Sequence, residues 1–200
     1  LLKRLESSVD AFRKSISKHM NFLEKLKIYL KSGRLLTKET FFKYIMSVDE
    51  ELEEEDLKDV LSEFKIKDYN ADDLFKDIDK DIHLLKNILE KVNKIKPEDD
   101  AKLKVLKDRL LELSKDGQII LFTYYADTLN YIYNEIIKDR RFSKLKIEAI
   151  SSSGLTSKNP QQREKIVEDL FSKKIDILLS TDVLSEGQNL QTAKYLINYD

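Results

Sequence analysis

The second half of the chain alternates short apolar runs with longer segments of helical period, and this alternation limits the fold more than any other feature. The strand-like runs are residues 119–122, which are apolar throughout, 146–151, which alternate like a strand, 175–180 and 194–199. The segments between them place apolar residues three or four positions apart, as amphipathic helices do. Strands that alternate with helices predict a parallel sheet with helices on its faces. Right-handed crossovers then bring the carboxyl ends of the strands to one edge, where such sheets bind ligands.

The first half of the chain has a different pattern. Residues 1–96 predict only helices, with spans at 1–30, 37–45, 47–64 and 70–95, and Pro97 ends the last of them. Two domains are therefore expected: a helical bundle over residues 1–98 and an α/β domain over residues 99–200. The fold class is α/β, a parallel sheet with flanking helices that an all-α segment precedes.

Composition excludes several kinds of protein. Cysteine is absent, so disulfides and thiolate metal sites are excluded, and a reducing cytoplasm is the expected location. No run of about 18 apolar residues predicts a membrane-spanning helix. The start lacks the apolar core of a signal peptide, and we expect the chain to begin inside a longer protein. His19 and His83 fall on different predicted helices, so no metal site is expected.

Charge is unevenly distributed along the helical half. Residues 1–48 carry eleven Lys and Arg against four Asp and Glu, whereas residues 49–98 carry nine against seventeen. The basic segment has two possible partners. It can meet phosphate, with Arg4, Arg13, Lys14 and Lys18 as candidate contacts, or it can meet the acidic segment and brace the neighbouring domain.

Hydroxyl side chains follow three of the predicted strands. Thr123 follows the first, Ser151 to Ser153 and Gly154 follow the second, and Ser180 and Thr181 end the third. Hydroxyls at strand ends suit phosphate binding, although Ser and Thr also cap helices. Further along, Gly187 would let the backbone approach another group closely, and Asn189 offers an amide for a ribose hydroxyl. The same pair is also compatible with an ordinary turn.

Together these residues carry a resemblance to a known family. The string IDILLSTDVLSEGQNLQTAKYLINYD, residues 175–200, resembles motif V in the second RecA-like lobe of superfamily 2 helicases. It is most similar to the Swi/Snf-like branch of bacterial or archaeal type. Residues 100–132 resemble the entry helix and motif IV strand, and residues 151–171 resemble the segment that follows. Residues 1–16 are similar to the helix before this lobe in helicases with a helical insertion.

The resemblance implies a role for each matching position. The residues that would contact nucleic-acid phosphates are Thr123, Gly154, Arg163, Ser180 and Thr181. For Arg163 a plain surface charge is an equal alternative. Gly187 and Asn189 would face the nucleotide in the cleft between two lobes. ATP and Mg²⁺ are the implied cofactors, with Mg²⁺ held by the first lobe, and DNA and that first lobe are the implied partners. No membrane partner is expected.

The resemblance therefore implies part of an ATP-dependent helicase or translocase. The chain has no G-x-x-x-x-G-K-[ST] loop, no acidic Walker B box and no arginine-finger motif. Because these groups do most of the electrostatic work in phosphoryl transfer, the chain alone is expected to be inactive. The alternative function is a non-catalytic scaffold, a helical arm on a nucleotide-fold domain that binds a protein partner. A small-molecule Rossmann enzyme is disfavoured, since no G-x-G-x-x-G follows a strand.

Overall fold

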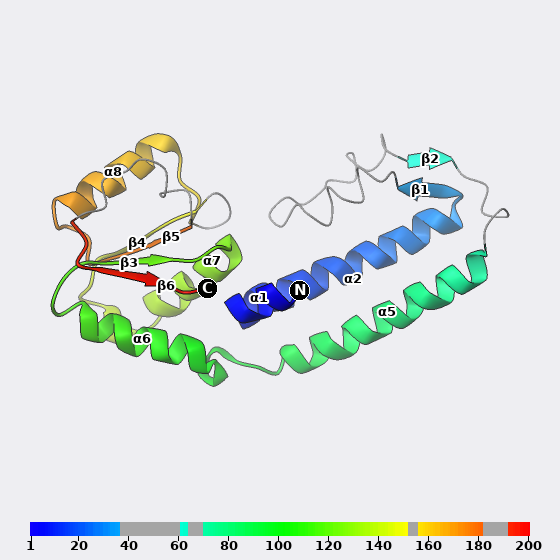
Figure 1. The fold of residues 1–200 in the computed structure, drawn as a ribbon, viewed down its shortest axis with the longest axis horizontal. Coiled ribbons are helices and arrows are strands. Elements are labelled where there is room, and N and C mark those ends of the chain that lie inside the picture. Colours follow the sequence, from blue (N-terminus) through cyan, green and yellow to red (C-terminus); the bar gives the residue numbers. More distant parts are fainter. Residues whose placement is uncertain (37–60, 64–69, 152–155, 182–191) are drawn as a thin grey trace. The chain divides into compact units, whose positions relative to one another are not determined.

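The computed structural model describes residues 1–36, 61–63, 70–151, 156–181 and 192–200. These residues form two compact units. One unit consists of Leu1 and Arg13–Lys94, and the other of Leu2–Phe12 together with Ile95–Asp200. The second unit is therefore built from two stretches of sequence. Figure 1 shows the helices and strands of both units.

A four-stranded parallel sheet forms the centre of the second unit. Its strands are β3 (Ile119–Phe122), β4 (Ile147–Ile150), β5 (Ile177–Ser180) and β6 (Tyr195–Asn198), in the order β4-β5-β3-β6. Every pairing is parallel, and Phe122 pairs with both Ser180 and Asn198. The predicted parallel sheet is confirmed, and the carboxyl ends of its strands share one edge.

Helices cover both faces of this sheet (Figure 1). The helices α6 (Ala101–Leu113) and α7 (Ala126–Ile137) lie on one face, and α8 (Pro160–Phe171) lies on the other. Side chains alternate along each strand. Ile119 and Leu121 pack with α6 and α7, whereas Ile120 packs with α8. This burial of both faces explains why β3 and β5 are nearly continuous apolar runs. The predicted flanking helices are confirmed.

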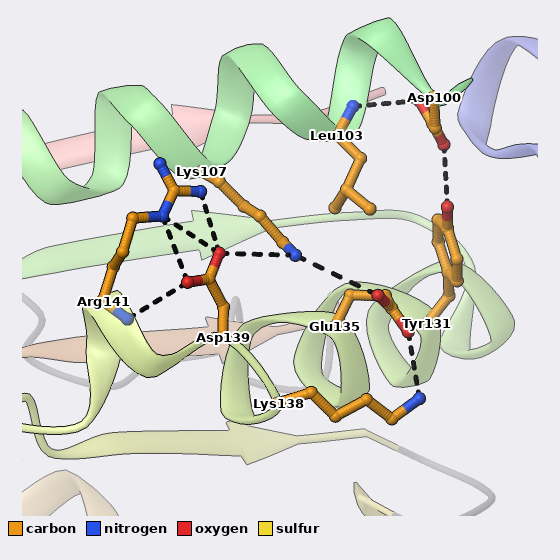
Figure 2. Close-up of polar contacts among 8 residues, drawn as sticks. All are labelled: Asp100, Leu103, Lys107, Tyr131, Glu135, Lys138, Asp139 and Arg141. Atoms are coloured by element: carbon orange, nitrogen blue, oxygen red, sulfur yellow. Dashed lines mark hydrogen bonds and ion pairs between the residues drawn. The ribbon is translucent and has the colours of Figure 1, made fainter. Parts of the chain in front are cut away.

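Polar contacts join α6 to α7 and to the short segment after α7 on one face of the sheet (Figure 2). Lys107 of α6 reaches Glu135 of α7 at 4.0 Å and Asp139 at 3.7 Å. Arg141, in the short 3-10 helix η3 (Arg140–Phe142), donates to Asp139 from Nη2 at 2.8 Å. These hydrogen bonds lower the pKa of Asp139 to about 2. At the other end of α6, Tyr131 of α7 donates to Asp100 at 3.0 Å.

Asp100 also caps α6. Its Oδ1 accepts from the Leu103 backbone N–H at 2.9 Å, as N-cap carboxylates do. The 3-10 helix η2 (Pro97–Asp99) precedes it. Burial and the nearby Asp100 carboxylate raise the pKa of Tyr131, so its hydroxyl keeps its proton and stays a donor.

The first unit consists of α2 (Val9–Lys31) from Arg13 onward, β1 (Arg34–Leu36), β2 (Leu61–Glu63) and α5 (Ala71–Val92). Lys27 of α2 forms an ion pair with Asp79 of α5. Arg13 Nη2 donates to the Val92 carbonyl at 3.2 Å. The buried side chains recur at helical spacing, and they are Ile16, Phe22, Leu23, Leu30, Ile78, Leu85 and Val92. The predicted helical character is therefore confirmed for α2 and α5.

Two local predictions for the first half are wrong. The predicted single helix over residues 1–30 is two helices, α1 (Leu2–Ser7) and α2, because Ser8 accepts from the Ala11 N–H and caps α2. Residues 61–63, predicted to end a helix, form β2, which pairs antiparallel with β1. Strands of three residues are too short to leave a periodic signal. The predicted helix over 37–45, and residues 47–60 of the next one, lie outside the described residues.

Within the described part of the chain, no helix is both long and apolar enough to cross a membrane.

Candidate nucleic-acid and nucleotide interface

Three of the predicted phosphate contacts meet at the carboxyl edge of the sheet. Thr123 follows β3, Ser180 ends β5, and Thr181 comes directly after it. The Thr123 N–H donates to the Ser180 carbonyl at 3.0 Å, and the Thr181 N–H donates to the Ile150 carbonyl at 3.2 Å. The parallel register thus places these residues side by side, as the order of elements predicts.

Their hydroxyl groups differ in what they can still bind. All three side chains are buried, and Thr123 and Thr181 are only 3% and 2% exposed. Thr123 Oγ1 donates to Asp200 Oδ2 at 2.7 Å, and Ser180 Oγ donates to the Thr181 carbonyl at 2.7 Å. Thr181 Oγ1 has no hydrogen-bond partner among the described residues. Thr181 therefore keeps a hydroxyl that no described residue satisfies, while the other two hydroxyls serve the fold.

The remaining predicted contacts divide into two groups. Gly154, Gly187 and Asn189 lie outside the described residues, so their roles stay predictions. Arg163 is half-buried in the first turn of α8, and its Nε donates to the Lys158 carbonyl at 2.8 Å. That bond fixes the guanidinium near the amino end of α8.

Ser151, which follows β4, is committed to an internal contact. Its Oγ lies 2.7 Å from Thr156 Oγ1, which itself donates to Asn130 Oδ1 at 2.9 Å. A threonine hydroxyl carries a single proton, so Ser151 must be the donor toward Thr156. The Ser151 hydroxyl thus holds the chain across the segment between β4 and α8.

Asp200 is a residue of the site that sequence reasoning missed. Its Oδ2 accepts from Thr123 Oγ1 and from the Tyr124 backbone N–H, and its Oδ1 accepts from Ser7 Oγ. Ser7 Oγ also lies 2.6 Å from Thr128 Oγ1, which lies 2.9 Å from Ser8 Oγ. The carboxylate thus links the carboxyl edge to the junction of α1 and α2.

The direction of these hydrogen bonds follows from counting protons. Ser7 gives its one proton to the Asp200 carboxylate, so Thr128 must donate to Ser7. Ser8 must then donate to Thr128, while it accepts from the Ala11 N–H at 3.1 Å. Every proton in this relay runs toward Asp200, which is the arrangement that an ionised carboxylate favours.

A second group of contacts supports the loop after β3. Arg4 Nη2 donates to Asp127 Oδ2 at 2.6 Å, and the Arg4 guanidinium lies 4.3 Å from the centre of the Tyr125 ring. Tyr125 in turn meets Tyr124 edge to face, with ring centres 4.9 Å apart. Tyr124 is 70% exposed. A buried arginine therefore orders two aromatic rings beside the candidate phosphate contacts.

Lys102 of α6 is a basic residue that serves the fold. Its Nζ donates to the Glu6 and Ser7 carbonyls at 2.7 and 3.2 Å and lies 3.9 Å from the centre of the Tyr199 ring. Burial lowers the pKa of Lys102, and the nearby carboxylates partly oppose that shift. Because its ammonium stabilises the last carbonyls of α1, it is not a free contact for a ligand.

The arrangement suits binding rather than covalent chemistry. The carboxyl ends of the parallel strands carry an unpaired hydroxyl and an exposed aromatic ring at one edge, and the first turn of α8 carries a fixed arginine. In the residues that the structure describes, no three His, Asp or Glu side chains gather as a metal site would require. An anionic, aromatic ligand fits these groups.

Comparison with known proteins identifies relatives of this region. The model of the helicase conserved C-terminal domain family matches residues 101–200. The chain is 31% identical over 116 residues to the DEAD-box ATP-dependent RNA helicase 38 of Oryza sativa, a match that covers 56% of this chain and 21% of that protein. It is 28% identical over 102 residues to the pre-mRNA-splicing ATP-dependent RNA helicase PRP28 of Kluyveromyces lactis, covering 51% and 17%.

The chain is also similar to one bacterial helicase and to one archaeal helicase of known structure. An uncharacterized ATP-dependent helicase of Bacillus subtilis is 29% identical over 131 residues, covering 58% of this chain and 22% of the relative. The helicase domain of Hef from Pyrococcus furiosus, a solved structure, covers 62% of this chain and 24% of that one, with 24% identity and a TM-score of 0.42. The chain thus matches about a fifth of the length of these curated relatives.

Proposed function

The chain belongs to the helicase conserved C-terminal domain family, and on this basis we propose that its second unit is the second RecA-like lobe of an ATP-dependent helicase or translocase. The lobe grips the phosphates of one nucleic-acid strand at the carboxyl edge of its sheet. A first lobe that carries the phosphate-binding loop completes the motor. ATP turnover opens and closes the gap between the two lobes, and the grip alternates with it.

The observation that carries the proposal is the unpaired hydroxyl of Thr181. It lies at the carboxyl edge, beside Thr123 and Ser180, where parallel sheets bind ligands. A buried hydroxyl without a partner is costly unless a ligand accepts its hydrogen bond. A phosphate oxygen is such an acceptor. Within the proposal, Gly154 and Arg163 also contact nucleic-acid phosphates.

The nucleotide belongs to the same proposal. Gly187 and Asn189 face the nucleotide in the cleft between the two lobes, and Mg²⁺ is held by the first lobe. The sequence contains no phosphate-binding loop, so we expect the chain alone to hydrolyse no ATP. Steady phosphate release by the purified chain would contradict this.

Three further parts of the proposal are the helicase branch, the kind of nucleic acid bound and the cellular location. The motif over residues 175–200 favours the Swi/Snf-like branch and DNA, and the lack of cysteine favours the cytoplasm. Two of the relatives described above carry the words RNA helicase in their names. On the strength of the motif we propose DNA as the bound nucleic acid. Because of these relatives, RNA is tested beside DNA in the binding experiment.

We propose that the basic residues of the first half serve the fold instead of gripping DNA. Two of the four candidate basic contacts are used within the protein, because Arg4 pairs with Asp127 and Arg13 donates to the Val92 carbonyl. The ion pair between Lys27 and Asp79 likewise joins the basic helix α2 to the acidic helix α5.

The test is a pair of threonine substitutions that keep the side-chain shape. Thr181→Val removes the buried unpaired hydroxyl, so we expect the free chain to be at least as stable as before and to bind a labelled single strand about tenfold more weakly at low salt. Thr123→Val breaks the bond to Asp200, so we expect a loss of stability. Ser114→Ala is the control, since Ser114 ends α6 and donates only to the Leu111 carbonyl. Equal affinities of Thr181→Val and the unmodified chain would overturn the phosphate grip. A chain that binds neither DNA nor RNA would favour the scaffold function.

A further inference from the structure

Tyr124 is an exposed aromatic residue at an ordered position. It is 70% exposed, more than the next most exposed aromatic side chain in the described residues, Phe171 at 58%. Its hydroxyl makes no hydrogen bond to another described residue, so no polar contact explains the orientation of the ring. Scattered exposed apolar side chains are ordinary in proteins. The surroundings of this ring set it apart from them.

Contacts on the backbone and on one side of the ring fix Tyr124 in place. Its backbone N–H donates to the Asp200 carboxylate, which also holds Thr123. Its ring meets Tyr125 edge to face, and Arg4 covers Tyr125 at 4.3 Å. Arg4 is only 7% exposed and is paired with Asp127. A buried ion pair and a cation–π contact thus help to order a ring that is exposed to solvent.

The position of this ring points to its ligand. Phe122 pairs with Ser180 across β3 and β5, so Tyr124, two residues beyond Phe122, leaves the same edge at which Thr181 keeps its hydroxyl. Neighbouring strands lie about 5 Å apart. A strand whose phosphate sits on Thr181 therefore brings its bases within reach of a tyrosine ring.

We propose that Tyr124 is a base-stacking site for single-stranded nucleic acid, a proposal that rests on the proposed function of the same edge. The ring takes any base, because every base has a π-face and stacking needs no hydrogen-bond pattern. Thr181 holds the backbone, and Tyr124 holds one base of that backbone. The pair gives the lobe a grip that does not depend on sequence.

The experiment measures binding of a short oligonucleotide to the 200-residue chain at low salt, in DNA and RNA versions. Tyr124→Ala is expected to weaken binding about tenfold, since stacking on an aromatic side chain contributes that much per base. Tyr124→Phe keeps the ring and is expected to bind like the unmodified chain. Phe171→Ala is the matched control, because it removes an exposed aromatic ring from α8.

A second arm removes the base instead of the ring. Oligonucleotides with one abasic position keep every phosphate, and scanning that position finds the stacked base. For the unmodified chain, one abasic position is expected to cost about as much as Tyr124→Ala does. In the Tyr124→Ala variant the same position is expected to cost nothing more, because the two changes remove one contact.

The outcomes separate this inference from the proposed function. If Thr181→Val weakens binding but Tyr124→Ala and the abasic scan do not, the stacking site is wrong and the phosphate grip stands. If Tyr124→Ala weakens binding while no abasic position matters, the ring contacts something other than a base, and the inference is again overturned. If the unmodified chain binds neither strand, the proposed function and the stacking site both fall.

Discussion

At the scale of single residues, Asp200 has the largest share of the polar contacts at the carboxyl edge. Its carboxylate accepts three hydrogen bonds, from Ser7 Oγ, Thr123 Oγ1 and the Tyr124 N–H. Replacement by alanine removes all three at once. Because each such bond contributes about 1 kcal/mol, we expect Asp200→Ala to lower the free energy of unfolding by about 3 kcal/mol. Urea denaturation of the chain measures it.

The conservative variant at this position sharpens the test. In Asp200→Asn the amide oxygen still accepts from Thr123 and Tyr124, and its NH₂ group can donate to Ser7. The relay through Thr128 and Ser8 then reverses its protons without losing a contact. We therefore expect Asp200→Asn to cost only about 1 kcal/mol, the loss of charge assistance. Equal losses for the Asn and Ala variants would show that the hydrogen bonds contribute little.

Gly117 is a second residue whose identity the packing dictates. A Cβ at this position would lie 2.8 Å from Lys194 Cβ, closer than two carbon atoms can approach. Lys194 is held there by its N–H, which donates to the Gln118 carbonyl at 3.0 Å. We expect Gly117→Ala to lower the free energy of unfolding by about 1–3 kcal/mol through this overlap, measured by urea denaturation. Combined with Lys194→Gly, which removes the clashing Cβ, the two losses should be less than additive.

Sequence separation decides which site residues can be foreseen. The positions of Thr123, Ser180 and Thr181 at strand ends were predicted correctly, because local pattern alone locates the end of a strand. Asp200 was missed because its partners Thr123 and Ser7 lie 77 and 193 positions away. Arg4 was considered as a possible DNA contact, yet its partner Asp127 is 123 positions distant. No periodicity carries information over such separations.

At the scale of elements, prediction succeeded where burial imposes a strong pattern. All four strands of the sheet were found. The strands β3 and β5 are buried on both faces and read as apolar runs, whereas β4 and β6 are only partly buried. The helices α6, α7 and α8 were found by their apolar stripes. The break at Ser8 was missed because the apolar spacing continues through it. The β1–β2 pair was missed because it is too short to show alternation.

Acid titration tests the contacts between α6, α7 and η3. The hydrogen bonds from Arg141 hold the pKa of Asp139 at about 2, below its ordinary 3.8. A carboxylate with a lowered folded pKa contributes stability that is present above pH 4 and is lost as pH falls toward 2. We expect Arg141→Ala to return the pKa of Asp139 toward 3.8 and to flatten the stability profile in that window.

The size of this effect is modest, because Arg141 is half-exposed and water screens the pair. We expect at most about 1 kcal/mol between pH 2 and pH 5, measured by urea denaturation across that range. Arg109→Ala is the control, since Arg109 pairs with Glu112 on the exposed face of α6. If both variants kept the same acid profile as the unmodified chain, the Asp139 contact would not be the cause.

At the scale of the whole molecule, the α/β lobe is discontinuous in sequence. Leu2–Phe12 belongs to the same compact unit as Ile95–Asp200, while Arg13–Lys94 forms the other. The first stretch contributes Arg4, Ser7 and Ser8 to the contacts behind the carboxyl edge. The boundary at residue 98, drawn from the change of sequence pattern, assigns these side chains to the helical half, because α1 and α2 share one apolar stripe. The lobe that the family model matches is therefore incomplete without Leu2–Phe12.

This organisation predicts how the chain can be divided. The chain passes from one unit to the other after Phe12 and again after Lys94. Arg13 donates to the Val92 carbonyl, so these two points of the chain lie near each other. A variant that joins residues 1–12 to residues 95–200 through a short Gly/Ser linker should fold as a stable lobe. Residues 95–200 alone lose the partners of Asp127, Thr128 and Asp200, and we expect them to be at least about 3 kcal/mol less stable.

Urea denaturation of the two shortened chains provides the measurement, and the linked variant with Arg4→Ala provides an intermediate. That change removes the ion pair to Asp127 and the support of Tyr125 but keeps the serine relay, so its stability should fall between the other two. The same series links stability to binding, because only the linked variant retains the contacts that order Tyr124. Equal stability of residues 95–200 and the linked variant would mean that the amino-terminal stretch lies against the lobe without contributing to it.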